Sequence, residues 1–194
     1  MQFVISLVLV LAAASVAGAG PLDHPGAMKA LNCSACHGFA GQSIADTMPS
    51  LAGVWPEYFK KAIADYASGK RPSTEMEPYA KQVMQFGVDD YAAYFGSLKR
   101  EPAKMPVDGA AAGRGRAAAV QCAGCHGPEG QGDRAKLVPA LAGQPPGYLK
   151  SQMTLFKQDR RSPGDANLKA LKAMMQGLPD STIEDLAAYY SSLR

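Results

Sequence analysis

The 194-residue sequence contains few of the side chains on which most enzymes depend. It has four cysteines and three histidines, and no serine–histidine–aspartate set, paired carboxylates or glycine-rich phosphate loop is recognisable in it. All four cysteines and two of the histidines fall in two short motifs, so no cysteine remains for a structural disulfide elsewhere. General acid–base catalysis therefore has few candidates, and the sequence predicts a protein that is not an enzyme by itself.

Strand patterns and large charged patches are missing as well. No segment alternates apolar and polar residues as a half-buried strand would, so we expect an all-α protein. The balance of 20 Lys and Arg against 17 Asp and Glu leaves a formal net charge of +3. The small basic clusters at 70–71 and 159–161 are too short for a nucleic-acid footprint, and we expect them to be solvated surface. No nucleic-acid partner is expected.

Residues 1–22 carry no charged side chain. An apolar run of about 15 residues that ends in Ala17-Gly18-Ala19 is typical of a secretory signal peptide with a small-residue cleavage site. We therefore expect residues 1–19 to be removed and the mature protein to be periplasmic. The segment before the apolar run lacks Lys and Arg, which departs from the usual pattern. The alternative is an uncleaved membrane anchor, although the run is short for crossing a bilayer.

The distinctive chemistry of the sequence lies in a motif that occurs twice, as CSACH at 33–37 and as CAGCH at 122–126. A structural zinc site needs four ligands, usually from two pairs. Here the two cysteine pairs stand in separate repeat units, so each unit would have to supply half a site. A thioredoxin-like dithiol needs a βαβ context, which the sequence does not offer. Neither zinc nor dithiol chemistry is favoured.

Covalent haem attachment explains every part of this motif. Two thiols that add to the two vinyl groups of haem must lie about one helical turn apart on one face. The next residue, a histidine, then lies under the ring and binds the iron. Cys-x-x-Cys-His is the signature of c-type haem attachment, so we predict two covalently bound haem c groups. The predicted attachment and ligand residues are Cys33, Cys36, His37, Cys122, Cys125 and His126.

The motifs belong to a longer internal repeat. Four blocks match in the same order in both halves of the chain, which chance will not produce. The blocks are 33–38 with 122–127, 49–53 with 139–143, 56–71 with 146–161, and 91–95 with 186–190. We therefore predict an N-terminal domain at 20–99, a proline-containing linker at 100–109 and a C-terminal domain at 110–194.

Each domain is expected to contain three helices around its haem. Prolines in the first helical turn mark several of them, and Asp89 and Asp90 favour the N-terminus of another. Ser181 or Thr182 is expected to cap the last helix. A covalent haem would give each short domain a large apolar body to pack around. The expected helices are 25–36, 56–68, 88–99, 110–125, 146–158 and 181–193.

The sixth iron ligand is expected to be a methionine, because His24, the only histidine outside the motifs, is expected to be a surface residue. A histidine–methionine pair holds haem iron six-coordinate and raises its reduction potential. In the first unit we favour Met76, which lies in a proline-flanked segment expected to be a loop. Met84 is the second choice, because apolar packing is the ordinary role of a methionine at that place.

The second unit does not repeat this ligand pattern. Leu171 stands at the position equivalent to Met76, and a leucine cannot bind iron. Met174 and Met175 lie three and four residues later, and either could be the ligand or part of the core. The remaining alternatives are an open coordination position, Lys169 and Lys172.

Over about residues 25–194 the chain resembles the dihaem cytochromes c4. It is also similar to the dihaem cytochrome subunit of flavocytochrome c sulfide dehydrogenase. The resemblance rests on the two Cys-x-x-Cys-His motifs, each followed by Pro-x-Leu-Ala-Gly and a closing helix with the sequence AAY(F/Y). Its most specific part is the segment 139–149. The resemblance implies two tandem class I cytochrome c domains whose haems face each other across the linker.

The resemblance also implies roles for individual residues. The family's axial histidines fall on the histidines of the two motifs, and its methionine falls on Met76. Pro49 and Pro139 fall where the family lines the histidine side of the haem, which implies that they fix the orientation of the histidine ring. Tyr94 and Tyr189 are expected to pack near the haems or in the helix core.

These expectations imply a carrier that shuttles single electrons between periplasmic or membrane-bound redox proteins. The expected partners are a membrane oxidase or a bc1-type complex, with peripheral membrane association. The alternative is the electron-accepting subunit of a complex with a flavoprotein dehydrogenase, such as one that oxidises sulfide. A third hypothesis, peroxide chemistry or gas sensing at the second haem, would require an open iron position there. The sequence shows no distal histidine, glutamine or glutamate for such chemistry.

Overall fold

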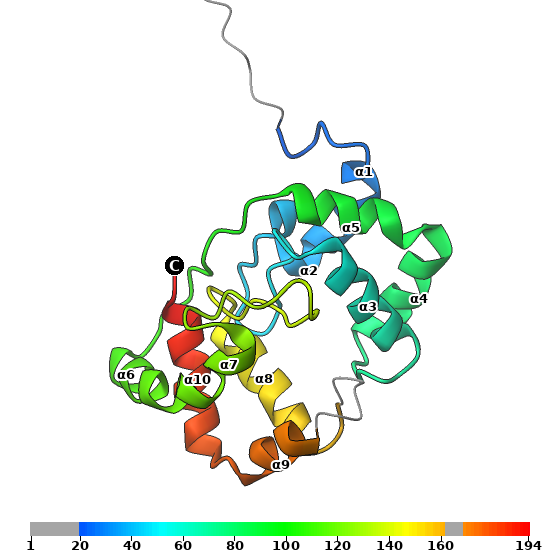
Figure 1. Cartoon of the computed structure of the whole chain (residues 1–194). Coiled ribbons are helices and arrows are strands. Elements are labelled where there is room, and N and C mark those ends of the chain that lie inside the picture. The colour runs from blue at the N-terminus through cyan, green and yellow to red at the C-terminus, as the bar shows by residue number, and fades with distance from the viewer. Residues whose placement is uncertain (1–19, 162–168) are drawn as a thin grey trace, which may run out of the picture.

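The chain folds into two helical units joined by one extended segment (Figure 1). The computed structural model describes residues 20–161 and 169–194, so the predicted signal peptide at 1–19 lies outside the described residues. Over the described ranges the only strand-like pairing is an isolated antiparallel bridge between Asp133 and Val138. The predicted all-α architecture is therefore confirmed. No helix in these ranges combines the length and the apolar character needed to cross a membrane.

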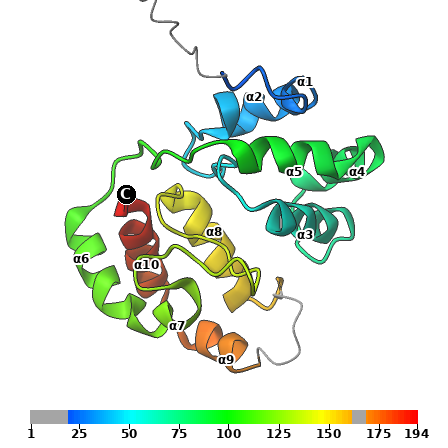
Figure 2. The same cartoon turned by 45° about the horizontal axis from the view of Figure 1, so that its top comes forward.

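The first unit carries the motif in a series of short turns and closes with three longer helices. The turns pack against the last of these helices (Figure 2). Pro56 lies in the first turn of α3, as predicted, because a proline there removes no helical hydrogen bond. The elements are α1 (Ala27–Ala30), η1 (Leu31–Cys33), α2 (Ser34–His37), η2 (Phe39–Gly41), α3 (Pro56–Ala67), α4 (Met76–Phe86) and α5 (Val88–Ser97).

The second unit repeats this order. Pro146 again lies in the first turn of the helix that follows the motif loop. Asp108 caps the first helix of the unit, since its carboxylate accepts hydrogen bonds from the amides of Ala110 and Ala111. The elements are α6 (Gly109–Ala118), η3 (Ala119–Gln121), α7 (Ala123–His126), α8 (Pro146–Lys157), α9 (Lys169–Gly177) and α10 (Asp180–Ser192).

Three of the expected helices differ from the structure. The helices predicted at 25–36 and 110–125 are each broken by a 3-10 turn just before the histidine motif. The last helix begins at Asp180 after Pro179, and neither Ser181 nor Thr182 caps it. A proline fixes its own φ near the helical value, so the chain can enter the helix without a side-chain cap.

Two helices, α4 and α9, were not predicted at all. In α4 only Ala80 and Val83 are buried among the residues after its first turn, so its apolar stripe is narrow. Met76 is the first residue of α4, so the expectation that it lies in a loop is wrong. The prolines at 72 and 78 suggested a loop, but Pro78 lies in the first turn of the helix, where a proline is tolerated.

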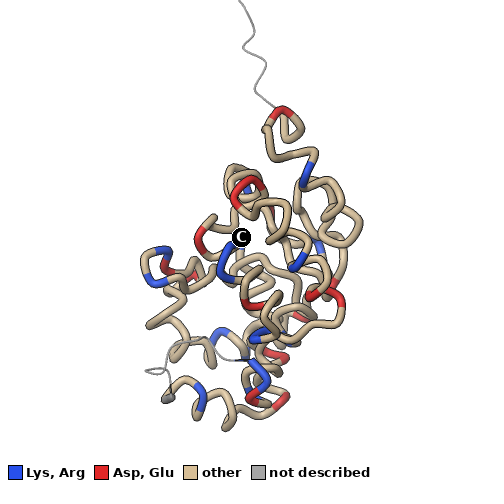
Figure 3. Tube along the Cα trace, turned by 90° about the vertical axis from the view of Figure 1, so that its right-hand side faces the viewer, with Lys and Arg blue, Asp and Glu red and all other residues tan. Residues whose placement is uncertain are grey.

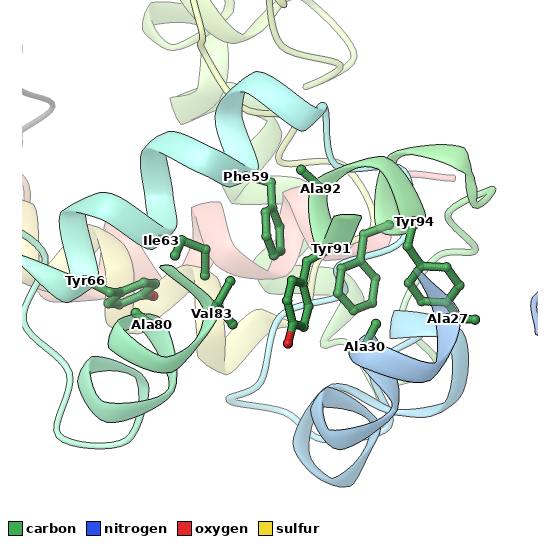
Figure 4. Packing of buried hydrophobic residues seen from close by; sticks show 11 residues of the cluster. Ala27, Ala30, Phe59, Ile63, Tyr66, Ala80, Val83, Tyr91, Ala92 and Tyr94 are labelled. Carbon is green, nitrogen blue, oxygen red and sulfur yellow. The ribbon is translucent and has the colours of Figure 1, made fainter. Parts of the chain in front are cut away.

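Each unit has its own apolar core. In the first unit Phe59, Ile63 and Tyr66 project from α3 toward α4 and α5 (Figure 4). Their spacing of four and three residues places them on one face of the helix. In the second unit Ile183, Leu186 and Tyr190 of α10 follow the same rule and are almost fully buried. Because each core is complete within its unit, the structure fits two tandem domains.

The segment between α5 and α6 contacts both units. The Nε of Arg100 donates to the carbonyl oxygen of Ala52 at 2.9 Å, and the amide of Ala103 donates to the carbonyl oxygen of Gly143 at 2.8 Å. The linker is thus attached to the repeated Leu-Ala-Gly turn of each unit.

Basic and acidic residues are interspersed along the trace and form no broad patch of one sign in the view of Figure 3.

Helices α6 and α10 approach closely at Gly115, which makes a testable prediction. A Cβ added there would overlap the backbone carbonyl of Asp185, whereas a Cβ at Gly113 of the same helix would meet nothing within 4 Å. We expect Gly115→Ala to lower the free energy of unfolding by about 1–3 kcal/mol through overpacking. The control Gly113→Ala should raise it by about 1 kcal/mol through helix propensity. Denaturant unfolding of the holoprotein measures both, and equal effects would contradict the packing described here.

Candidate functional site

The two units enclose one continuous cavity of about 1450 Å³. A pocket for one small ligand typically measures about 300–1,000 Å³, so the volume of this cavity is larger than one such ligand requires. The structure brings every predicted site residue to its wall, although they come from both units. From the first unit these are Cys33, Cys36, His37, Pro49 and Met76, and from the second Cys122, Cys125, His126, Pro139, Met174 and Met175.

The motif residues reach the cavity because each motif forms a single helical turn. Helix α2 ends at Gly38, whose φ is 76°, and helix α7 ends at Gly127, whose φ is 77°. Only glycine adopts such a left-handed φ without a steric cost, so the chain turns away immediately after each histidine. The cysteines and the histidine of a motif therefore lie close together and line the cavity.

Both histidine rings are held by the same hydrogen bond. The Nδ1 of His37 lies 2.8 Å from the carbonyl oxygen of Pro49, and the Nδ1 of His126 lies 3.0 Å from that of Pro139. A carbonyl oxygen only accepts, so each Nδ1 must carry the proton, and the Nε2 lone pair is left free for a metal. Burial lowers the pKa of both histidines and outweighs the opposing effect of the carbonyl, which keeps the rings neutral.

The four motif cysteines form no disulfide. Burial raises the pKa of Cys33 to about 11 and also raises that of Cys122. A reactive dithiol needs a lowered thiol pKa, and the burial of Cys33 and Cys122 acts in the opposite direction. Within the described part of the chain, no three His, Cys, Asp or Glu side chains gather in a way that could hold a metal ion.

The candidate methionines occupy different environments. Met76 is half-buried and packs beside the first core. In the second unit Leu171 and Met174 are half-buried, and they lie three residues apart on one face of α9. Met175 is only 6% exposed and packs inside the second core. The second-choice ligand Met84 is 47% exposed and is not part of the cavity wall, so the expectation that it packs in the core is wrong.

Arg71 was expected to be solvated surface, and this is wrong. It is 3% exposed, and its guanidinium donates to the hydroxyl of Tyr148 at 2.7 Å and to the Oε1 of Gln152 at 2.8 Å. Arg161 donates to the same oxygen of Gln152 at 2.5 Å. Neither arginine forms an ion pair within the described ranges, although a buried cation is costly without a counter-charge. Two cations on one neutral acceptor at the cavity wall fit a ligand that carries carboxylates, as haem does.

Of the two roles expected for Tyr94 and Tyr189, near the haems or in the helix core, the structure shows the helix core. The cavity is lined by Tyr91 and Tyr190, whereas Tyr94 and Tyr189 do not reach its wall. Tyr94 lies in the first core and packs its ring 5.6 Å from that of His24. The nitrogen Nδ1 of His24 accepts a hydrogen bond from the amide of Gly26, so this histidine is fixed on the fold and faces away from the cavity chemistry.

Known proteins resemble this chain in sequence and in fold. A family model described as cytochrome c matches residues 110–194. The chain is 32% identical over 199 residues to cytochrome c4 of Pseudomonas aeruginosa, a match that covers 99% of this chain and 98% of the relative.

The chain belongs to the cytochrome c4 family. A solved structure of reduced recombinant cytochrome c4 from Pseudomonas stutzeri superposes with a TM-score of 0.78 at 30% identity, covering 87% of this chain and 97% of that one. The chain is also 30% identical to a thiosulfate dehydrogenase electron acceptor of Stutzerimonas stutzeri, over 84% of this chain and 80% of the relative. This cytochrome c4 therefore carries two covalent haem c groups and is an electron-transfer protein.

Proposed function

We propose that each unit of this cytochrome c4 holds its haem through both cysteines of its motif. Cys33 and Cys36 attach the first haem, and Cys122 and Cys125 attach the second. The Nε2 of His37 and of His126, which the proline carbonyls leave free, would bind the two irons. When bound, haem iron supplies one-electron chemistry, while the protein supplies the ligands, a low dielectric constant and the positioning.

We propose Met76 as the second axial ligand in the first unit and Met174 in the second. Met76 and Met174 are both half-buried at the cavity wall. Met175 is covered by protein atoms of its own core, where it occupies the helix position of Ala80 in the first unit. Met174 follows Leu171 by about one helical turn on the same face, so the ligand shifts along α9 by roughly 4.5 Å.

A single observation carries the proposed function: both motifs open into the same cavity. Two haems in one cavity lie close enough for electrons to pass between them inside one chain. We propose that the protein accepts single electrons at one haem and delivers them from the other. The buried Arg71 and the half-buried Arg161 would counter the carboxylates of the cofactor at this shared wall.

The proposed site of action is the periplasm, after removal of the uncharged segment 1–19. Its proposed donors and acceptors are redox proteins such as a membrane oxidase or a bc1-type complex, with peripheral membrane association. A second candidate is the electron-accepting subunit of a dehydrogenase complex. This candidate is supported by the relatives named thiosulfate dehydrogenase electron acceptor and by a TM-score of 0.75 to a thiosulfate dehydrogenase from Marichromatium purpuratum.

An anaerobic redox titration of the holoprotein tests the carrier function. The protein should take up two electrons per chain in two reversible one-electron steps, and rapid mixing with a substoichiometric reductant should spread the electron over both haems within the chain. The absorbance of the reduced haems and their order of reduction give both results. Reduction of only one haem would contradict the electron-carrier function. A rate of peroxide consumption that rises in proportion to the protein concentration would contradict it as well.

Variants of the three methionines test the ligand assignment. Met76→Ala should remove the axial methionine resonances of the first haem from the proton NMR spectrum of the reduced protein and lower its reduction potential, because a methionine ligand raises the potential. Met174→Leu should do the same at the second haem. The matched control Met175→Leu should leave both sets of resonances in place. If Met175→Leu instead removes the second set, Met175 is the ligand.

A further inference from the structure

Gln144 of the second unit holds a backbone segment of the first unit. Its Oε1 accepts a hydrogen bond from the amide of Ser50 at 2.9 Å, and its Nε2 donates to the carbonyl oxygen of Ser50 at 3.0 Å. Gln144 is 5% exposed and Ser50 is 1% exposed. A buried amide that satisfies both backbone groups of one residue in this way fixes that residue in place.

Ser50 is the residue next to Pro49, whose carbonyl oxygen orients His37. The contact from Gln144 therefore lies one peptide bond away from the hydrogen bond that fixes the histidine ring. Within the first unit the same loop is supported by the amide of Ser43, which donates to the Oγ of Ser50 at 3.2 Å. The position of the Pro49 carbonyl thus depends on groups from both units.

A second contact joins the same loop to the same part of the second unit. The carbonyl oxygen of Asp46 accepts from the amide of Tyr148 at 2.9 Å, and its Oδ1 accepts from the amide of Gly147 at 2.9 Å. These amides belong to the first turn of α8, where helical amides lack partners of their own. The loop that orients His37 is therefore attached to residues 144–148 at four points.

The repeated units are not equivalent in this respect. In the first unit Val54 stands at the position equivalent to Gln144 in the Leu-Ala-Gly-x turn, and valine has no side-chain amide that could bind a backbone segment. The loop before Pro139 is held within its own unit by the pairing of Asp133 with Val138. Across the interface this loop has the exposed ion pair of Arg134 with Glu57, which contributes little.

We propose that Gln144 is a positioning residue for the first haem, although it belongs to the domain of the second. The inference rests on the proposed role of His37 as an iron ligand. Through Ser50 and Pro49, Gln144 fixes the hydrogen bond on the Nδ1 of His37, and that bond raises the basicity of the ligand. The reduction potential of the first haem therefore depends on the docking of the second unit, whereas among the described residues the Pro139 loop has only the exposed pair of Arg134 with Glu57 across the interface.

The substitution Gln144→Leu tests this proposal, because leucine fills the space without either hydrogen bond. With a looser Pro49 carbonyl the imidazole donates less to the iron, which destabilises the ferric state. The equilibrium constant for reduction of the first haem should rise by up to about tenfold, which corresponds to about 59 mV, while the second haem stays unchanged. Proton NMR of the His37 and His126 rings during a redox titration assigns each potential to its haem.

Gln42 provides a matched control. Like Gln144, its side-chain amide makes one donated and one accepted hydrogen bond to backbone groups. It donates to the carbonyl oxygen of Lys99 at 2.6 Å and accepts from the amide of Glu101 at 3.1 Å. Gln42→Leu should leave both potentials unchanged. A third variant, Gln144→Met, also removes both hydrogen bonds, adds no charge and fills the space with a more adaptable side chain. It should give the same selective rise at the first haem, and it decides the question if Gln144→Leu fails to retain both haems.

The outcomes separate this proposal from the ligand assignment. A selective shift at the first haem in the Gln144 variants, absent in Gln42→Leu, supports it. Unchanged potentials, or equal shifts at both haems, would overturn the positioning role and leave His37 as a ligand. If the ring of His37 in the unmodified protein shows no iron-induced NMR shift when the protein is oxidised, the ligand assignment itself fails and the proposal with it.

Discussion

The hydrogen bond from a histidine Nδ1 to a proline carbonyl is the constraint on which the rest of this structure depends. It occurs once in each unit, at 2.8 Å to Pro49 and at 3.0 Å to Pro139. It fixes which nitrogen carries the proton, and it turns the free Nε2 of each ring toward the cavity. The glycine after each histidine and the loop that brings each proline back are needed to make this one contact. Everything that the haem iron requires from the histidine side follows from it.

The shared cavity explains why the two units form one working protein. Each unit closes a core of its own, yet neither alone surrounds the space in front of its motif. The wall between the two motifs carries Arg71 and Arg161, whose charges lack carboxylate partners among the described residues. We propose that a cofactor with its own carboxylates relieves this cost for the buried Arg71 and the half-buried Arg161. Duplication thus gives the two haems a common, electrostatically matched interior.

Much of the fold and of the haem sites could be predicted from the sequence, because the residues that define each motif are close neighbours in the chain. The spacing in Cys-x-x-Cys-His, the repeated blocks and Pro56 and Pro146 at helix starts all act within a few residues, and the structure agrees on the architecture. What could not be predicted depends on contacts between units. Arg71 was expected at the surface, but Tyr148 and Gln152 of the other unit cover it. Nothing local in the sequence indicates that Gln144 binds the backbone of Ser50. The helix α4 was missed because prolines on both sides of Met76 are equally compatible with a loop.

We propose that both irons have protein ligands on both faces, so that the chain carries electrons and binds no small molecule at either iron. Carbon monoxide binds reduced haem iron only where one face is open. The most direct measurement is therefore the number of carbon monoxide molecules bound per fully reduced chain, followed by haem absorbance. The structure predicts none at either haem. Binding of one molecule per chain would contradict the claim, because it would show that one of the two irons has an open face.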